Sequence, residues 1–199
     1  MRLLILRHGA TRANDLHRYA GRRTDEPLSE RGVEQCRRAG VDERVRRVYA
    51  SPMLRALQTA RLCFPNAEVV PVPGLEEFDF GDFEGRSADQ MADDEAYRAW
   101  VDDDCEGTCP GGESRDDFAR RTRRALDGLL RASADEGEEP VVVVAHGGTV
   151  MAALDGFYDK SVGNCEGYVA TVRLLEEGFL LEDARRFGTL AETAEASRP

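Results

Sequence analysis

Two short apolar runs, each followed by a histidine and a glycine, constrain the fold more than any other feature of the sequence. Residues 3–6 precede Arg7, His8 and Gly9, and residues 141–145 precede His146 and Gly147. Uninterrupted apolar runs of this length are typical of central strands that are covered on both faces of a sheet. Because ligands of open α/β sheets bind just outside the carboxyl ends of the strands, we expect the two histidines to lie near one site.

The rest of the chain alternates between strand-like and helix-like segments. Residues 45–50 and 68–72 are short β-rich runs, and residues 168–174 and 179–182 resemble a late hairpin. Helices are expected from Ser29 to Gly40, from Pro52 to about residue 62, and over residues 113–131. This alternation predicts a layered α/β fold.

The length and the segment pattern predict one domain with a small insertion. The 199 residues are enough for one domain, which we place at residues 1–186. The acidic stretch at 74–112 does not follow the strand and helix pattern, so we expect a cap or active-site insertion there. Residues 187–199 are polar and are expected to form a C-terminal tail.

The charge of the chain narrows the class of partner. A net charge of −11 argues against binding to nucleic acid or to an anionic membrane. An anionic substrate must therefore be met by local positive charge. Lys160 is the only lysine, and arginine side chains bind phosphate through two parallel hydrogen bonds. Genome base composition explains this arginine bias equally well.

The cysteines and the N-terminus favour a cytoplasmic protein without a bound metal. The five cysteines are odd in number and scattered, which indicates free thiols rather than a disulfide framework. Cys105 and Cys109 lack further ligands nearby, so no structural zinc is expected. Residues 1–6 form a strand-like run that is too short for a signal peptide, and no run approaches the roughly 20 apolar residues of a membrane span.

The residues around the two strand ends suit a phosphate ligand. Arg7 places a guanidinium beside the His8 imidazole, and Gly9 lets the backbone approach a ligand closely. Arg55 falls on the first turn of the helix that follows Pro52, where a helix N-terminus also favours anions. Taken singly, each histidine is equally well explained as a structural residue, and Arg55 as a solvated one.

Six segments in this order resemble the histidine phosphatase superfamily, which includes the cofactor-dependent phosphoglycerate mutases and the α-ribazole phosphatases. The resemblance extends from about residue 3 to residue 154. It is carried by residues 6–14, 27–35, 51–60, 75–85, 110–114 and 144–148. It implies a three-layer α/β/α sandwich with a mostly parallel central sheet and a small cap insertion.

The resemblance also implies the chemistry. His8 would attack phosphorus and become a phosphohistidine, with Arg7, Arg55 and His146 around the phosphoryl oxygens. Glu77, in the family's Leu-x-Glu element, would donate a proton to the leaving group, and Glu76 is the alternative if the loop register slips by one residue. Neither a metal ion nor an organic cofactor is implied.

Four further residues are candidates for substrate binding by the same resemblance. They are Thr11, Asn14, Arg22 and Gly147. Arg22 lies in a loop that borders the pocket in this family, although a solvated loop explains it equally well. His17 matches no catalytic position and is expected on the surface.

Three functions fit these residues. The chain lacks the length and insertions associated with mutases, which favours a phosphatase acting on a small-molecule phosphate ester. Residues 75–85 followed by Arg86 resemble the α-ribazole phosphatase branch in particular. The alternatives are phosphoglycerate mutase-type transfer and a non-catalytic phosphate-binding module. The sequence leaves a homodimer open.

Overall fold

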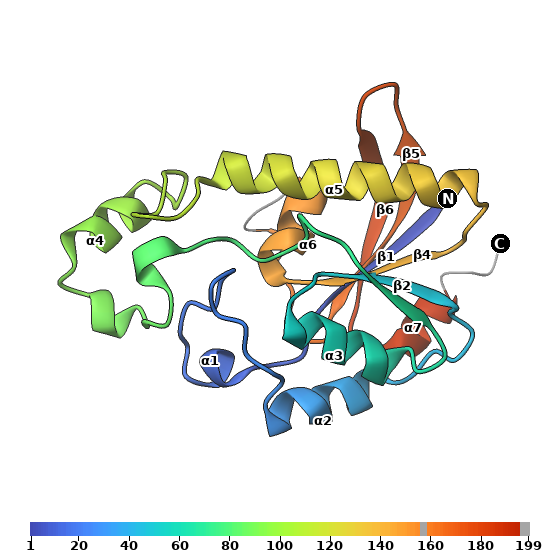
Figure 1. The fold of residues 1–199 in the computed structure, drawn as a ribbon, viewed down its shortest axis with the longest axis horizontal. Coiled ribbons are helices and arrows are strands. Elements are labelled where there is room, and N and C mark those ends of the chain that lie inside the picture. Colours follow the sequence, from blue (N-terminus) through green and yellow to red (C-terminus); the bar gives the residue numbers. More distant parts are fainter. Residues whose placement is uncertain (156–158, 196–199) are drawn as a thin grey trace.

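A six-stranded sheet forms the centre of the computed structural model, which describes residues 1–155 and 159–195 (Figure 1). The strand order is β3-β2-β4-β1-β5-β6. β1 pairs in parallel with β4, and β2 pairs in parallel with both β4 and β3, whereas β5 and β6 are antiparallel. The strands are β1 (Arg2–Arg7), β2 (Arg47–Ala50), β3 (Glu68–Pro71), β4 (Val141–Ala145), β5 (Gly167–Leu174) and β6 (Phe179–Phe187). The predicted mostly parallel central sheet is confirmed.

Helices cover both faces of the sheet, which gives the predicted three layers (Figure 1). Side chains alternate along β1, so that Leu3 and Ile5 enter one apolar cluster while Leu4 and Leu6 enter the other. The first cluster is closed by α5 (Arg115–Asp135) and α6 (Gly147–Ala153), and the second by α2 (Glu30–Ala39), α3 (Leu54–Cys63) and α7 (Leu190–Glu195). β4 alternates in the same way, which explains why both central strands are apolar throughout.

Local capping sets the helix boundaries. The Ser29 side chain accepts a hydrogen bond from Gly32 N at the start of α2, and Gly40 ends this helix with a φ of +93°. Ser114 accepts a bond from Asp117 N and begins α5 one turn before its first buried residue, Phe118. A short helix, α1 (Arg12–Asp15), begins at Thr11.

The acidic insertion has an aromatic core of its own. Its regular structure consists of two single 3₁₀ turns (Gly81–Phe83 and Asp89–Met91) and α4 (Glu95–Asp102). The charged side chains face outward, and Phe78, Phe83, Tyr97 and Trp100 pack inward against Phe118 of α5. In Figure 1 this insertion is the green segment that projects beyond the N-terminal end of α5.

The C-terminal segment differs from the polar tail expected for residues 187–199. Strand β6 continues to Phe187, and α7 follows after two residues. Phe187 and Leu190 are both 3% exposed and pack on the α2 and α3 side of the sheet. Two apolar side chains three residues apart therefore anchor this segment, so the domain extends at least to residue 195. Residues 196–199 lie outside the described part of the chain.

No helix within residues 1–155 and 159–195 is long and apolar enough to cross a membrane.

Candidate active site

His8 follows the last residue of β1, and its ring is held in one tautomer. Its Nδ1–H donates to the Gly9 carbonyl oxygen at 2.6 Å. The proton is therefore on Nδ1, and Nε2 carries a lone pair, which accepts a bond from Arg55 Nε at 3.2 Å. An imidazole in this state is a nucleophile at Nε2.

The backbone around His8 is fixed on three sides. Gly9 N donates to Thr59 Oγ1 at 3.0 Å, and Asn164 Nδ2 donates to the His8 carbonyl oxygen at 3.0 Å. A Cβ atom at Gly9 would lie 2.7 Å from the Gly32 carbonyl oxygen, so this close approach requires glycine. The His8 backbone is thus held by contacts from α2, α3 and the turn before β5.

Arg55 is fully buried, and backbone carbonyl groups hold both terminal nitrogens of its guanidinium. Nη1 donates to Thr24 O at 2.7 Å, and Nη2 donates to Ala20 O at 3.3 Å and Gly21 O at 3.2 Å. Burial lowers the pKa of Arg55, but a guanidinium remains protonated in proteins. Arg55 therefore presents a fixed positive charge to His8.

His146 and Arg7 each have one buried polar atom without a partner among the described residues. Ser51 Oγ accepts from Met53 N and lies 2.7 Å from His146 Nε2, a hydrogen bond that orients the ring and leaves Nδ1 for another partner. This Nδ1 and Arg7 Nε are the two unpartnered atoms, while Arg7 Nη1 is anchored on Val162 O at 2.7 Å. Unsatisfied buried donors are costly and are common where a ligand supplies the acceptor.

Burial and positive charge keep both histidines neutral. Burial is the largest cause that lowers the pKa of His8 well below its usual 6.5, and Arg55 and Arg7 lower it further. Burial likewise lowers the pKa of His146, with contributions from Arg55 and His8. The two rings lie 5.1 Å apart between centroids. We call Arg7, His8, Arg55 and His146 the phosphate site.

Glu77 borders the phosphate site, and Glu76 does not. The Glu77 carboxylate accepts from Phe78 N at 2.9 Å and from Gly148 N at 3.1 Å. The Glu76 carboxylate instead accepts from Gly74 N at 2.7 Å and lies 3.9 Å from Arg121. A Cβ atom at Gly148 would lie 2.3 Å from Glu77 Oε1, so glycine at this position leaves room for the acid.

The other predicted residues lie in three different places. Gly147 begins α6 and lines the same pocket as Arg7 and Glu77. Thr11 and Asn14 bond to each other as the capping box of α1, and Asn14 Oδ1 also lies 3.5 Å from Asn164 Nδ2 beside the His8 backbone. Arg22 is exposed and does not line the pocket, and the groups of its loop that contact Arg55 are the backbone carbonyls of Ala20, Gly21 and Thr24.

The sequence reasoning missed several supporting residues. Asn164 and the Val162 carbonyl come from the turn before β5, which carried no recognised motif. Ser51 and Thr59 lie within a recognised segment, but their hydroxyl groups had no assigned role. Only the folded chain shows that they orient His146 and the Gly9 backbone.

An apolar pocket of about 290 Å³ extends from the phosphate site into the insertion. Its apolar wall consists of Phe78, Phe80, Trp100, Phe118 and Met151. Arg7, Glu77, Gly147 and Gly148 line the end next to the phosphate site, and Cys105 and Arg115 line the remainder. We call this cavity the aromatic pocket.

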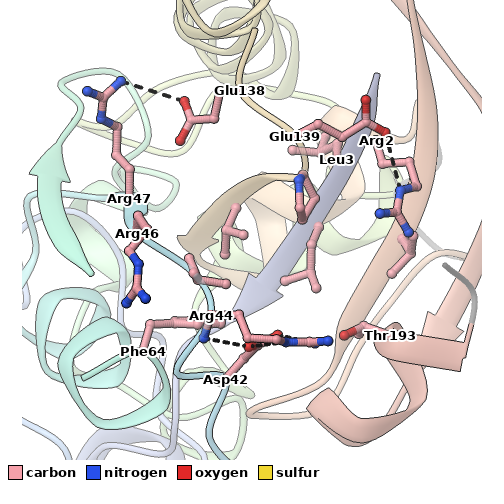
Figure 2. A pocket seen from close by; sticks show the side chains of 15 residues that line it. Arg2, Leu3, Asp42, Arg44, Arg46, Arg47, Phe64, Glu138, Glu139 and Thr193 are labelled. Atoms are coloured by element: carbon pink, nitrogen blue, oxygen red, sulfur yellow. Dashed lines mark hydrogen bonds and ion pairs between the residues drawn. The ribbon is translucent and has the colours of Figure 1, made fainter. Parts of the chain in front are cut away.

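A second cavity of about 390 Å³ lies at the opposite end of the sheet (Figure 2). It is lined by the first residues of β1, β2 and β4. Three of its arginines pair with neighbouring carboxylates, as Figure 2 shows for Arg2 with Glu139, Arg44 with Asp42 and Arg47 with Glu138. No histidine lines this cavity, whereas the smaller aromatic pocket shares Arg7 with the phosphate site.

Within the described part of the chain, no cluster of three or more histidine, cysteine or carboxylate side chains is arranged to hold a metal ion. The other three residues of the phosphate site, Arg7, Arg55 and His146, instead lie around the His8 imidazole.

Comparisons with known proteins agree with this geometry. A family model described as histidine phosphatase superfamily (branch 1) matches residues 3–171. An adenosylcobalamin/α-ribazole phosphatase of Escherichia coli is 35% identical over 163 residues, which are 77% of this chain and 77% of that protein. A bifunctional protein of Mycobacterium tuberculosis is 38% identical over 157 residues, but the match spans 73% of this chain and only 41% of that longer protein.

The solved structures include a mycobacterial glucosyl-3-phosphoglycerate phosphatase. It is 28% identical, with a TM-score of 0.76, and the match covers 93% of this chain and 96% of that one.

Proposed function

The chain belongs to the histidine phosphatase superfamily, and from this premise we propose that it is a metal-independent phosphatase that hydrolyses small phosphomonoesters through a phosphohistidine at His8. The observation that carries the proposal is the tautomer of His8. Its Nδ1–H is fixed on the Gly9 carbonyl, and its Nε2 lone pair faces Arg55, with Arg7 and His146 beside it.

The first step transfers the phosphoryl group to His8. Nε2 attacks phosphorus, the ester P–O bond breaks, and Glu77 in its protonated form donates a proton to the departing oxygen. Arg7 Nε–H would donate to the phosphoryl oxygens, and so would His146 Nδ1 in the tautomer that carries its proton there, which would give both buried atoms a partner. Together with Arg55 they stabilise the charge that develops on the equatorial oxygens.

The second step releases phosphate. Glu77, now ionised, accepts a proton from a water molecule that attacks phosphorus, and the P–N bond breaks to return neutral His8. Glu77 suits both steps because it lies where the phosphate site meets the aromatic pocket. The residues of the site supply the positive charge, so no step requires a metal ion.

α-Ribazole phosphate is the first substrate to test, because the E. coli relative is an α-ribazole phosphatase and residues 75–85 resemble that branch. A phosphoglycerate mutase-type transfer uses the same phosphohistidine and is the second candidate. It must protect this intermediate from water, and the half-exposed Glu77 and the opening of the pocket favour hydrolysis.

A steady-state phosphate-release assay tests this function. We expect turnover of a small phosphomonoester by the wild type, unchanged turnover in EDTA, and no detectable turnover by His8→Ala. Loss of activity in EDTA with recovery on adding a divalent ion would contradict the metal-independent mechanism. Normal turnover by His8→Ala would contradict the nucleophile.

A further inference from the structure

The aromatic pocket is the space that a leaving group must occupy. Arg7, Glu77, Gly147 and Gly148 line its inner end, and the same Arg7 belongs to the phosphate site. A phosphorus atom in line with His8 Nε2 would direct its ester oxygen past Glu77 and into this cavity. The chemistry of the walls therefore bears directly on which ester is cleaved.

The walls form a fixed apolar slot. The Phe80 ring lies 4.9 Å from Phe78 and 6.3 Å from Trp100, and Phe118 lies 5.4 Å from Phe78, all between centroids. Phe78 and Trp100 are 6% and 8% exposed, so the aromatic cluster of the insertion holds them from behind. Rings that are already packed lose little freedom when a ligand binds, and they favour a flat apolar partner.

The positive charges that line the pocket already have partners. Arg7 is anchored on Val162 O and faces the phosphoryl group. Arg115 forms an ion pair with Glu106 and donates to the Asp104 carbonyl oxygen. The remaining ionisable group is Glu77, which is protonated while the ester is bound in the mechanism proposed above and so offers a second carboxylate no positive charge. A leaving group that carries a carboxylate would lose its hydration without gaining a dedicated cation.

Resting on the phosphatase proposed above, we infer that the aromatic pocket selects phosphate esters whose leaving group is an uncharged alcohol bearing an apolar ring, and that it discriminates against esters whose leaving group carries a carboxylate. Phe80 and Met151 determine this preference. They are the two half-buried members of the apolar wall, so part of each side chain is open to a leaving group, while the buried rings Phe78 and Trp100 support Phe80 from behind.

The test compares four alkyl monoesters of primary alcohols, so that differences in leaving-group basicity remain small. They are 3-phenylpropyl phosphate, glycerol 1-phosphate, O-phosphoserine and 3-phosphoglycerate. We expect kcat/KM for 3-phenylpropyl phosphate to exceed that for glycerol 1-phosphate roughly tenfold or more, because a buried ring contributes that much binding. The two carboxylate-bearing esters should be the poorest substrates.

Two variants assign the preference to the pocket. Phe80→Ala should remove most of the advantage of 3-phenylpropyl phosphate, because it should lower kcat/KM for this ester far more than kcat/KM for glycerol 1-phosphate. Phe83→Ala is the matched control, because Phe83 belongs to the same aromatic cluster but does not line the pocket. Met151→Arg should raise kcat/KM for O-phosphoserine and 3-phosphoglycerate, a gain that structural damage would not produce.

Equal kcat/KM for 3-phenylpropyl phosphate and glycerol 1-phosphate in an enzyme that turns over both would overturn this inference and leave the phosphatase intact. So would faster cleavage of the carboxylate-bearing esters by the wild type. Absence of turnover with all four esters and with α-ribazole phosphate would count against the proposed function instead.

Discussion

The phosphate site and the aromatic pocket share one boundary at Glu77 but are built in opposite ways. The phosphate site consists of polar side chains at the ends of central strands or at the start of a helix. Backbone carbonyl groups hold three of them, and the Ser51 hydroxyl orients His146. His8 bonds to Gly9 O, Arg7 to Val162 O and Arg55 to three carbonyl groups. The aromatic pocket consists of side chains from the insertion, α5 and α6 that touch one another.

This difference separates two tasks. The phosphate site is held mainly by backbone groups, so a change at one residue disturbs its neighbours. Such a site suits the chemistry that is common to all phosphate esters. A pocket made of side-chain contacts accepts substitutions singly, so it suits the part of the substrate that varies. Mutations should therefore affect every substrate when they fall in the first region and selected substrates when they fall in the second.

The largest effect should come from Arg55→Ala. Removal of this buried guanidinium should lower kcat/KM about 10³-fold or more for every ester, because it takes a fixed positive charge from the phosphoryl oxygens. Arg61→Ala, an exposed position on the same helix, is the matched control. Initial rates on two esters measure this effect, and circular dichroism checks that each variant folds. A loss that differs between the two esters would contradict the separate tasks proposed for the phosphate site and the aromatic pocket.

Glu77→Gln should produce the next largest effect, and it should depend on the leaving group. We expect a loss of roughly 10²-fold to 10³-fold on alkyl esters, which need a proton donor. The loss on 4-nitrophenyl phosphate should be far smaller, because its leaving group departs as a stable anion. Glu76→Gln, one residue away and outside the pocket, should change both rates little. A larger loss for Glu76→Gln would assign the acid to the other register.

The two buried histidines of the phosphate site should lower the free energy of unfolding at acid pH. Folding lowers the pKa of His8 and His146 below their usual values, so the unfolded chain binds more protons as the pH falls through about 6.5. The free energy of unfolding should fall by about 1 kcal/mol per histidine between pH 7 and 5.5.

Urea denaturation at several pH values measures the slope of the free energy of unfolding against pH. This slope should flatten in a His8→Asn/His146→Asn double variant and persist in His17→Asn. His17 is exposed and has a φ of +51°, a conformation that asparagine adopts readily. An unchanged slope in the double variant would show that these histidines titrate normally in the folded protein.

Gly128→Ala should have the smallest effect and should leave both regions unchanged. Gly128 lies within α5, and a Cβ atom there would meet nothing within 4 Å. Alanine should raise the free energy of unfolding by about 0.5–1 kcal/mol through helix propensity, with kcat/KM unchanged. Gly74→Ala should destabilise the protein, since Gly74 has a φ of +94° and its Cβ would lie 2.9 Å from Ala125 Cβ. Thermal unfolding distinguishes the two variants.

The same contrast explains which features the sequence could predict. Strands β1 and β4 were predictable because central strands are apolar throughout, and the histidines after them mark the carboxyl edge of the sheet. The order of the recognised segments extended this prediction to Arg55. Local signals such as Ser29 and Gly40 also placed the ends of α2 within a residue.

The aromatic pocket could not be predicted in this way. Phe80, Trp100, Phe118 and Met151 come from separate elements, and no periodicity links them. The acidic composition of residues 74–112 also obscured an apolar core, because the charges face solvent. The sequence also left Arg22 open between a pocket residue and a solvated loop; its side chain is exposed, and the loop contributes the Ala20, Gly21 and Thr24 carbonyl groups that hold Arg55.

The central claim is that His8 carries the phosphoryl group, and a rapid-quench experiment with a ³²P-labelled phosphomonoester tests it most directly. The account predicts a phosphoprotein in the wild type that is labile to acid and stable to base, that decays as free phosphate appears, and that is absent in His8→Ala. Label of the same stability on His8→Ala, or turnover by the wild type without any phosphoprotein in the quenched samples, would contradict it.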